Sequence, residues 1–137
     1  MSAPNGLAEQ VAALPWPALI EALDAEGVAK VTGLLAPPEC ASLVRLYDDA
    51  QRFRSKVVMG RHGYGSGEYR YFAYPLPPLV ATLRELLYPK LVPLANRWHE
   101  ALGSATRFPD AHAAFVERCH AAGQLRPTPL LLRYENR

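Results

Sequence analysis

Cysteine is scarce in this 137-residue chain, and long apolar runs are missing altogether. The two cysteines, Cys40 and Cys119, lie far apart without metal-site spacing, which predicts reduced thiols and no disulfide framework. The N-terminus has no apolar segment like that of a signal peptide, and no run approaches the ~18 apolar residues of a membrane span. These absences predict a cytoplasmic protein without a membrane partner.

Motifs that hold metals or phosphates are also missing. None of the four histidines begins a His-x-Asp, His-x-Glu or His-x-x-x-His motif. His112, Cys119 and His120, on a predicted helix, are therefore interpreted as solvated or locally bonded side chains. The glycine-rich segment 60–67 lacks the Lys-Ser/Thr of a P-loop, so it is either a mobile cover over a substrate or a plain hairpin connection. We predict no metal ligand and assign no catalytic residue.

Charge is small in total but unevenly distributed. The net charge is +2, yet residues 1–50 hold 2 basic and 7 acidic side chains, and residues 51–137 hold 13 and 6. The second part therefore carries a net +7 and favours either a polyanionic ligand or a solvated basic face.

Residues 51–74 concentrate both cations and aromatics. Five basic side chains stand there against the single acid Glu68, with six of the chain's thirteen aromatics. Cations interleaved with flat apolar rings suit nucleic acid, which offers phosphates and unstacked bases. The alternative is a half-buried strand whose rings only pack. Strand alternation places Tyr69 and Tyr71 on one face and Arg70 on the other, so one face can be core and the other a groove.

The hydrophobic pattern predicts an α+β fold that is mostly helical, with helices on one side of a few strands. The run Leu130–Leu132 is the most apolar and needs strand partners on both sides, so we expect it to be left with an exposed edge. Expected helices span residues 7–14, 16–25, 37–53, 79–87, 89–102 and 109–122; expected strands span 28–32, 55–59, 68–74 and 128–134.

Several segments resemble a bacterial family of 2-oxoglutarate- and Fe(II)-dependent oxygenases described as acting on damaged DNA. The loose part of the likeness is GVAKVTGLLAPPECASLVRLYDDA; the specific part is GRHGYGSGEYRYFAYPLP, YPKLVPLANRWHEALG and FPDAHAAFVERCHAAGQLRPTPLLLRYENR. The match spans about residues 25–135. It implies that residues 1–137 are one incomplete domain: the N-terminal helical support layer and first strands of a double-stranded β-helix, or jelly roll.

The resemblance also implies cofactors and site residues. The family's His-x-Asp motif, distal His and Arg are absent from this sequence, so we expect Fe(II) and 2-oxoglutarate to serve the full-length family and neither to bind this chain. Tyr134 matches a tyrosine that touches 2-oxoglutarate in related demethylases. Tyr69, Arg70, Tyr71 and Arg133 are the expected lining of a substrate cleft.

Two functions follow, and whether this chain is itself an enzyme stays open. The first is the N-terminal portion of a dioxygenase that hydroxylates or demethylates damaged nucleic acid, inactive without its iron ligands. The second is a non-enzymatic module whose basic and aromatic strand holds nucleic acid or a protein partner. In either case the exposed strand 128–134 makes self-association an expected property.

Overall fold

The computed structural model describes residues 6–63 and 65–135. The chain divides into two compact units. One, the helical unit, consists of the residues up to Leu34 together with Pro78–Gln124. The other, the sheet unit, consists of Leu35–Pro77 together with the residues from Leu125 onward.

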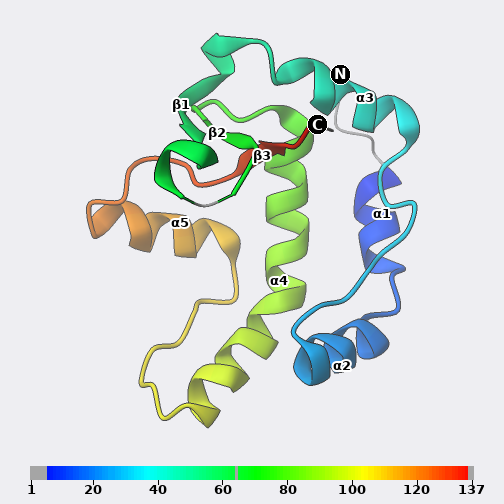
Figure 1. Cartoon of the computed structure of the whole chain (residues 1–137). Helices are drawn as coiled ribbons and strands as arrows, with labels where there is room; N and C mark the ends of the chain where they lie inside the picture. The colour runs from blue at the N-terminus through cyan, green and yellow to red at the C-terminus, as the bar shows by residue number, and fades with distance from the viewer. Residues whose placement is uncertain (1–5, 64, 136–137) are drawn as a thin grey trace. The chain divides into compact units, whose positions relative to one another are not determined.

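The helical unit contains α1 (Gly6–Ala12), α2 (Trp16–Glu26), α4 (Pro78–Ala101) and α5 (His112–Ala121), with α4 in contact with the other three (Figure 1). Proline in the first turn of α2 is tolerated because that amide has no helical acceptor. Gly27 ends α2 in a left-handed conformation, φ 75°, which glycine adopts without strain. The buried apolar side chains of this unit are Leu7, Val11, Leu19, Leu79, Val92 and Leu94.

The two helices predicted over 79–87 and 89–102 are wrong: α4 is one helix of 24 residues with Pro89 and Pro93 inside it. Each proline removes a backbone hydrogen bond, a cost that normally breaks a helix. Here, burial of Leu79 on one side of Pro89 and of Val92 and Leu94 beyond it ties both halves to the same core. Tertiary packing therefore outweighs the local signal.

The sheet unit contains α3 (Pro37–Leu46), a 3-10 turn at Ala50–Arg52, β1 (Phe53–Val58), a second 3-10 turn at Met59–His62, β2 (Glu68–Phe72) and β3 (Leu130–Arg133). The three strands form one antiparallel sheet in the order β1-β2-β3 (Figure 1). Tyr47, Met59 and Phe72 are its buried large side chains. Within the described residues β3 is an edge strand, as the sequence predicted.

Two further expectations are corrected. The strand predicted over 28–32 does not form; this segment is irregular, and its Val28 is 63% exposed. The helix predicted over 37–53 ends at Leu46. The reason lies in Asp49, whose carboxylate accepts a hydrogen bond from the Gln51 amide (3.2 Å) and so begins a separate turn.

Candidate functional site

The strand register sorts the candidate substrate residues onto two faces of the sheet. Directly opposed residues in an antiparallel pair point to the same side. Arg70 pairs with Lys56 and Leu131, and Glu68 pairs with Val58 and Arg133. Tyr69 and Tyr71 pair with Val57 and Ser55, and with Leu132 and Leu130. Arg70 and Arg133 therefore share one face, whereas Tyr69 and Tyr71 share the other, so the structure does not bring all four together.

On the first face the two arginines flank a tyrosine that the sequence did not indicate. The guanidinium carbons of Arg70 and Arg133 each lie 4.8 Å from the centre of the Tyr47 ring. Arg70 Nη1 also donates to the Tyr47 carbonyl at 3.1 Å. Tyr47 is 5% exposed, so both cation–π contacts are made in a largely dry environment, where they are strongest.

Glu68 is the anionic centre of this cluster. The Tyr47 hydroxyl donates to Glu68 Oε2 at 2.5 Å, and Arg133 Nη2 donates to Glu68 Oε1 at 3.2 Å. The Lys56 ammonium lies 3.8 Å from Oε2. We refer to Tyr47, Glu68, Arg70 and Arg133 as the Tyr47 cluster. Glu68, the only acid among residues 51–74, thus already binds the cations around it.

The same contacts shift two pKa values. The hydrogen bond from Tyr47 and then the charges of Arg133 and Lys56 lower the pKa of Glu68, against an opposing effect of burial. Burial, followed by the hydrogen bond to the Glu68 carboxylate, raises the pKa of Tyr47 to about 12. At neutral pH the pair is therefore a phenol that donates to a carboxylate.

The positive charge of Arg133 is already compensated. Besides Glu68, its guanidinium lies 3.7 Å from Asp48 and 3.4 Å from Glu135. The predicted substrate residue Arg133 thus faces three carboxylates. A carboxylate or phosphate ligand would have to displace one of them.

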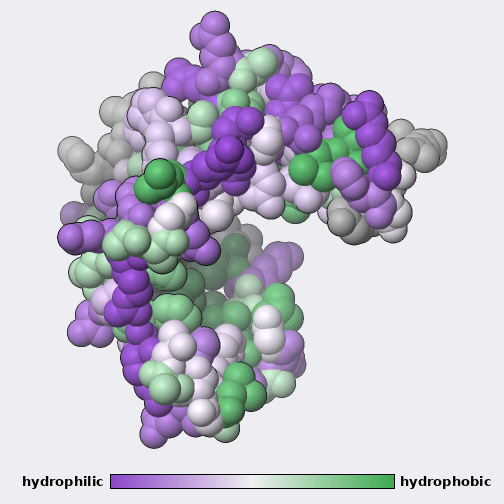
Figure 2. Space-filling view, turned by 90° about the vertical axis from the view of Figure 1, so that its left-hand side faces the viewer, coloured by the Kyte–Doolittle hydropathy of each residue, from purple (hydrophilic) through white to green (hydrophobic). Residues whose placement is uncertain are grey.

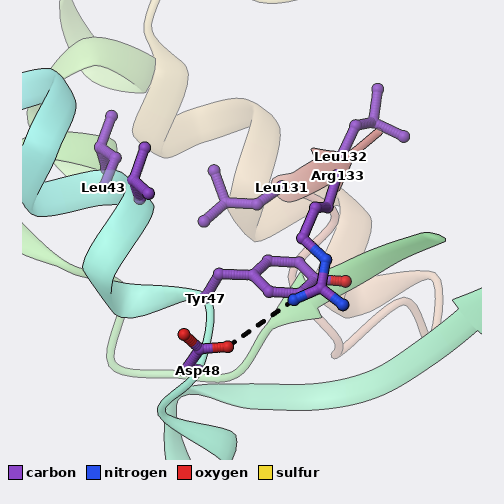
Figure 3. Close-up of a pocket in the computed structure, with 7 residues that line it drawn as sticks. Leu43, Tyr47, Asp48, Leu131, Leu132 and Arg133 are labelled. Atoms are coloured by element: carbon purple, nitrogen blue, oxygen red, sulfur yellow. Dashed lines mark ion pairs between the residues drawn. The ribbon is translucent and has the colours of Figure 1, made fainter. Parts of the chain in front are cut away.

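Two pockets meet at Arg133. An apolar pocket of about 210 Å³ lies between α3 and β3, with Leu131 and the Tyr47 ring beside it and Asp48 directed at Arg133 (Figure 3). A polar pocket of about 190 Å³ adjoins the glycine-rich segment and is lined by Val58, Ser66, Gly67, Glu68, Arg133 and Glu135. The first pocket suits an apolar group. The second contains the carboxylates of Glu68 and Glu135 and suits a hydrogen-bond donor.

Tyr134, the expected 2-oxoglutarate contact, lies over the glycine-rich segment. Gly67 has φ +117°, and a Cβ there would stand 2.8 Å from Tyr134 Cδ1 and 3.0 Å from the Arg133 carbonyl oxygen. Only glycine allows this approach. The segment itself joins β1 to β2, closed by the Met59 amide donating to the Gly67 carbonyl at 3.0 Å, as expected for a hairpin connection.

The second face combines a cation with two tyrosines. The Arg54 guanidinium carbon lies 4.4 Å from the centre of the Tyr71 ring, and Tyr69 meets Tyr71 edge-on at 5.6 Å. Arg54 Nε is held by the Pro127 carbonyl at 2.9 Å. The pairing register of β1 with β2 shifts between Phe53 and Ser55, at the position of Arg54. No sequence signal marks that shift.

No metal site is found in the part of the chain that the structure describes. No group of three or more His, Cys, Asp or Glu side chains gathers closely enough to hold an ion. His112 instead packs against the ring of Tyr88 at 5.4 Å, and burial lowers its pKa. Cys40 and Cys119 are free thiols. None of the helices within these described segments combines the length and apolar character needed to cross a membrane.

Residues 67–137 match the Oxygenase-NA family, described as an oxygenase catalysing oxidative methylation of damaged DNA. The match covers half of the chain, and the chain belongs to this family. The resemblance to an oxygenase family that acts on damaged DNA is confirmed at that level.

The chain is also similar to two uncharacterized proteins of Mycobacterium tuberculosis, one from strain CDC 1551 and one from strain H37Rv. Each is 38% identical over 87 residues, which cover 61% of this chain and 37% of the relative. The chain thus spans little more than a third of the length of these relatives. No solved structure matches it.

Proposed function

We propose that this chain is the N-terminal portion of a 2-oxoglutarate- and Fe(II)-dependent dioxygenase of damaged nucleic acid, and that it contributes substrate contacts and structural support. The observation that carries the proposal is the family match over residues 67–137, which includes β2 and β3. We further propose that the double-stranded β-helix of such oxygenases is completed by residues other than these. Fe(II) would supply the oxidising chemistry in the whole protein.

The residues described here do not fit an iron site, because no three potential ligands converge. They also make a poor 2-oxoglutarate site. Tyr134 is 65% exposed, and its neighbour Arg133 is occupied by three carboxylates. No catalytic step is therefore assigned to this chain's own side chains.

The substrate contacts that we propose lie on the second face, at Arg54, Tyr69 and Tyr71. Unstacked bases pack on aromatic rings, and a guanidinium on a ring presents both a flat surface and a charge to a nucleotide. Arg54 is fixed by the Pro127 carbonyl, so little side-chain freedom is lost on binding. Arg70 and Arg133 act differently: they hold Tyr47 and Glu68 in place behind this face.

The test has two parts. Fluorescence anisotropy with a labelled single-stranded oligonucleotide should show weak binding that falls as salt rises, since phosphate contacts release counterions. Tyr71→Ala and Arg54→Ala should each weaken it, and Arg45→Ala, a matched change at an exposed arginine of α3, should not. Binding that is indifferent to both second-face changes would contradict the proposed surface.

The second part measures oxidation. Succinate release with Fe(II), 2-oxoglutarate and an alkylated oligonucleotide should be absent for the 137-residue chain and present for a protein of the relatives' full length. Absence in both would refute the dioxygenase proposal. Salt-dependent DNA binding without oxidation by the longer protein would favour the alternative, a non-enzymatic nucleic-acid-binding module.

A further inference from the structure

We infer that Arg54 and Ser55 together bind one phosphodiester group of a nucleic-acid strand. The inference rests on the proposed nucleic-acid contact of the second face, and it extends that contact from the bases to the backbone of the ligand. Ser55 lies on the second face because it pairs with Tyr71 in the register of β1 with β2. Its hydroxyl adds a phosphate donor to the surface that Arg54, Tyr69 and Tyr71 form.

Arg54 differs from the neighbouring cations of the sequence in the charge of its partners. Hydrophilic and hydrophobic residues are interspersed on the face of the molecule seen in Figure 2, so polar character alone does not distinguish one cation from another. Arg52 Nε lies 3.5 Å from Asp49 Oδ2, and Lys56 Nζ lies 3.8 Å from Glu68 Oε2. Each of these two positive charges therefore already faces a carboxylate.

The contacts of Arg54, by comparison, are with neutral groups throughout the part of the chain that the structure describes. Its Nε donates to the carbonyl of the buried Pro127 at 2.9 Å, and its guanidinium carbon lies 4.4 Å from the centre of the Tyr71 ring. Its Nη1 lies 3.5 Å from Ser55 Oγ. These groups orient the guanidinium without compensating its charge, which therefore remains for an anionic ligand.

Ser55 places a hydroxyl donor directly beside this charge. Arg54 Nη1 is the donor in the contact between the two side chains, so Ser55 Oγ accepts there and keeps its own proton for a ligand. A separation of 3.5 Å is at the long end of hydrogen bonding, so a phosphate oxygen gains more from both donors than they gain from each other. Guanidinium groups suit phosphate in charge and in geometry. Ser55 is exposed, so the backbone of a strand can reach it.

A second arginine–serine pair in the same unit lacks this arrangement. Arg45 Nη2 donates to Ser42 Oγ at 3.2 Å, but the Ser42 hydroxyl donates to the Pro38 carbonyl at 3.0 Å. The Ser42 proton is therefore already used within α3. Arg45 and Ser42 thus provide controls of the same residue types, without the free hydroxyl donor of the proposed site.

Salt-dependent binding separates the two proposed contacts. Fluorescence anisotropy of a labelled single-stranded oligothymidylate with the 137-residue chain measures the dissociation constant at several salt concentrations. Ser55→Ala should weaken binding about fivefold, as expected for the loss of one hydrogen bond, and should leave the salt dependence unchanged because no charge is removed. Arg54→Ala should reduce the slope of log K against log salt by about 0.7, the value for one phosphate of a single strand. Ser42→Ala and Arg45→Ala should change neither quantity.

Ser55→Asp makes the test stricter. The new carboxylate would pair with Arg54 and repel phosphate, so this change should weaken binding more than Ser55→Ala. Because Ser55 is exposed, its variants test the site even where Arg54→Ala does not fold. Ser55 variants that bind like the wild type, or no better distinguished than Ser42→Ala, overturn the phosphate site; if Tyr71→Ala still weakens binding, the proposed function stands. Wild-type binding that is absent or independent of salt overturns both.

Discussion

Replacing Tyr47 by phenylalanine removes one hydroxyl from the centre of the sheet unit. That hydroxyl donates to the ionised Glu68 at 2.5 Å, and the ring is 5% exposed. Hydrogen bonds to charged groups contribute roughly 1.5–3 kcal/mol. Phenylalanine keeps the ring beneath both guanidinium groups, so the cation–π contacts remain. We therefore expect the free energy of unfolding of this unit to fall by about 2 kcal/mol.

The assay must report on the sheet unit. Both tryptophans, Trp16 and Trp98, belong to the helical unit, so intrinsic fluorescence is unsuitable. A urea titration followed by the NMR amide signals of β2 measures the right transition. Tyr134→Phe is the control, because that exposed side chain should change stability by less than about 0.5 kcal/mol.

The penalty should also depend on pH. The pKa of Glu68 is lower in the folded state, so its contribution is present above the unfolded pKa and lost as pH falls through the folded pKa. The pKa of Tyr47 is raised from 10.0 to about 12, so its contribution is lost as pH rises through that range. Tyr47→Phe should therefore cost most near neutral pH. A penalty below about 0.5 kcal/mol, or one that is the same in acid, would refute this account of the cluster.

Three further perturbations have distinct expected outcomes. Arg70→Ala should lower the stability of the sheet unit by about 2 kcal/mol in the same titration, because it leaves a buried carbonyl and ring without their cation; unchanged stability would contradict the cluster. Gly67→Ala should destabilise more than Gly65→Ala, since both have positive φ but only Gly67 lies against the ring of Tyr134; equal losses of melting temperature would exclude the close approach. Burial lowers the folded pKa of His112, so the stability of the helical unit should fall as pH drops through the unfolded value near 6.5. Unfolding followed by tryptophan fluorescence measures this stability, and His112→Gln should make it depend less on pH.

Most elements of the fold could be predicted from the sequence, and the misses have physical causes. Alternation and turn residues located β1 and β2, and the apolar run located β3 as an exposed edge. The prolines inside α4 led to the wrong prediction of two helices, because packing against the core outweighs the local loss of hydrogen bonds. The segment 28–32 alternates like a strand, but a strand also needs a partner, and no neighbouring strand is available to it in the described sheet.

The candidate site was less predictable because the spacing of neighbouring residues does not show which side chains from distant parts of the sequence come into contact. Alternation correctly separated Arg70 from Tyr71, yet it could not tell which face is buried; the fully buried neighbour is Phe72, on the side of Arg70. A count of cations also overstated the free charge, since Arg70 is bonded to Tyr47 across 23 residues of sequence and Arg133 to Glu68 across 65. Arg54, whose guanidinium lies over the Tyr71 ring, is the cation to which we assign the proposed ligand contact. If nucleic acid binds this sheet, the salt dependence should therefore respond to Arg54, and changes at Arg70 should act through folding.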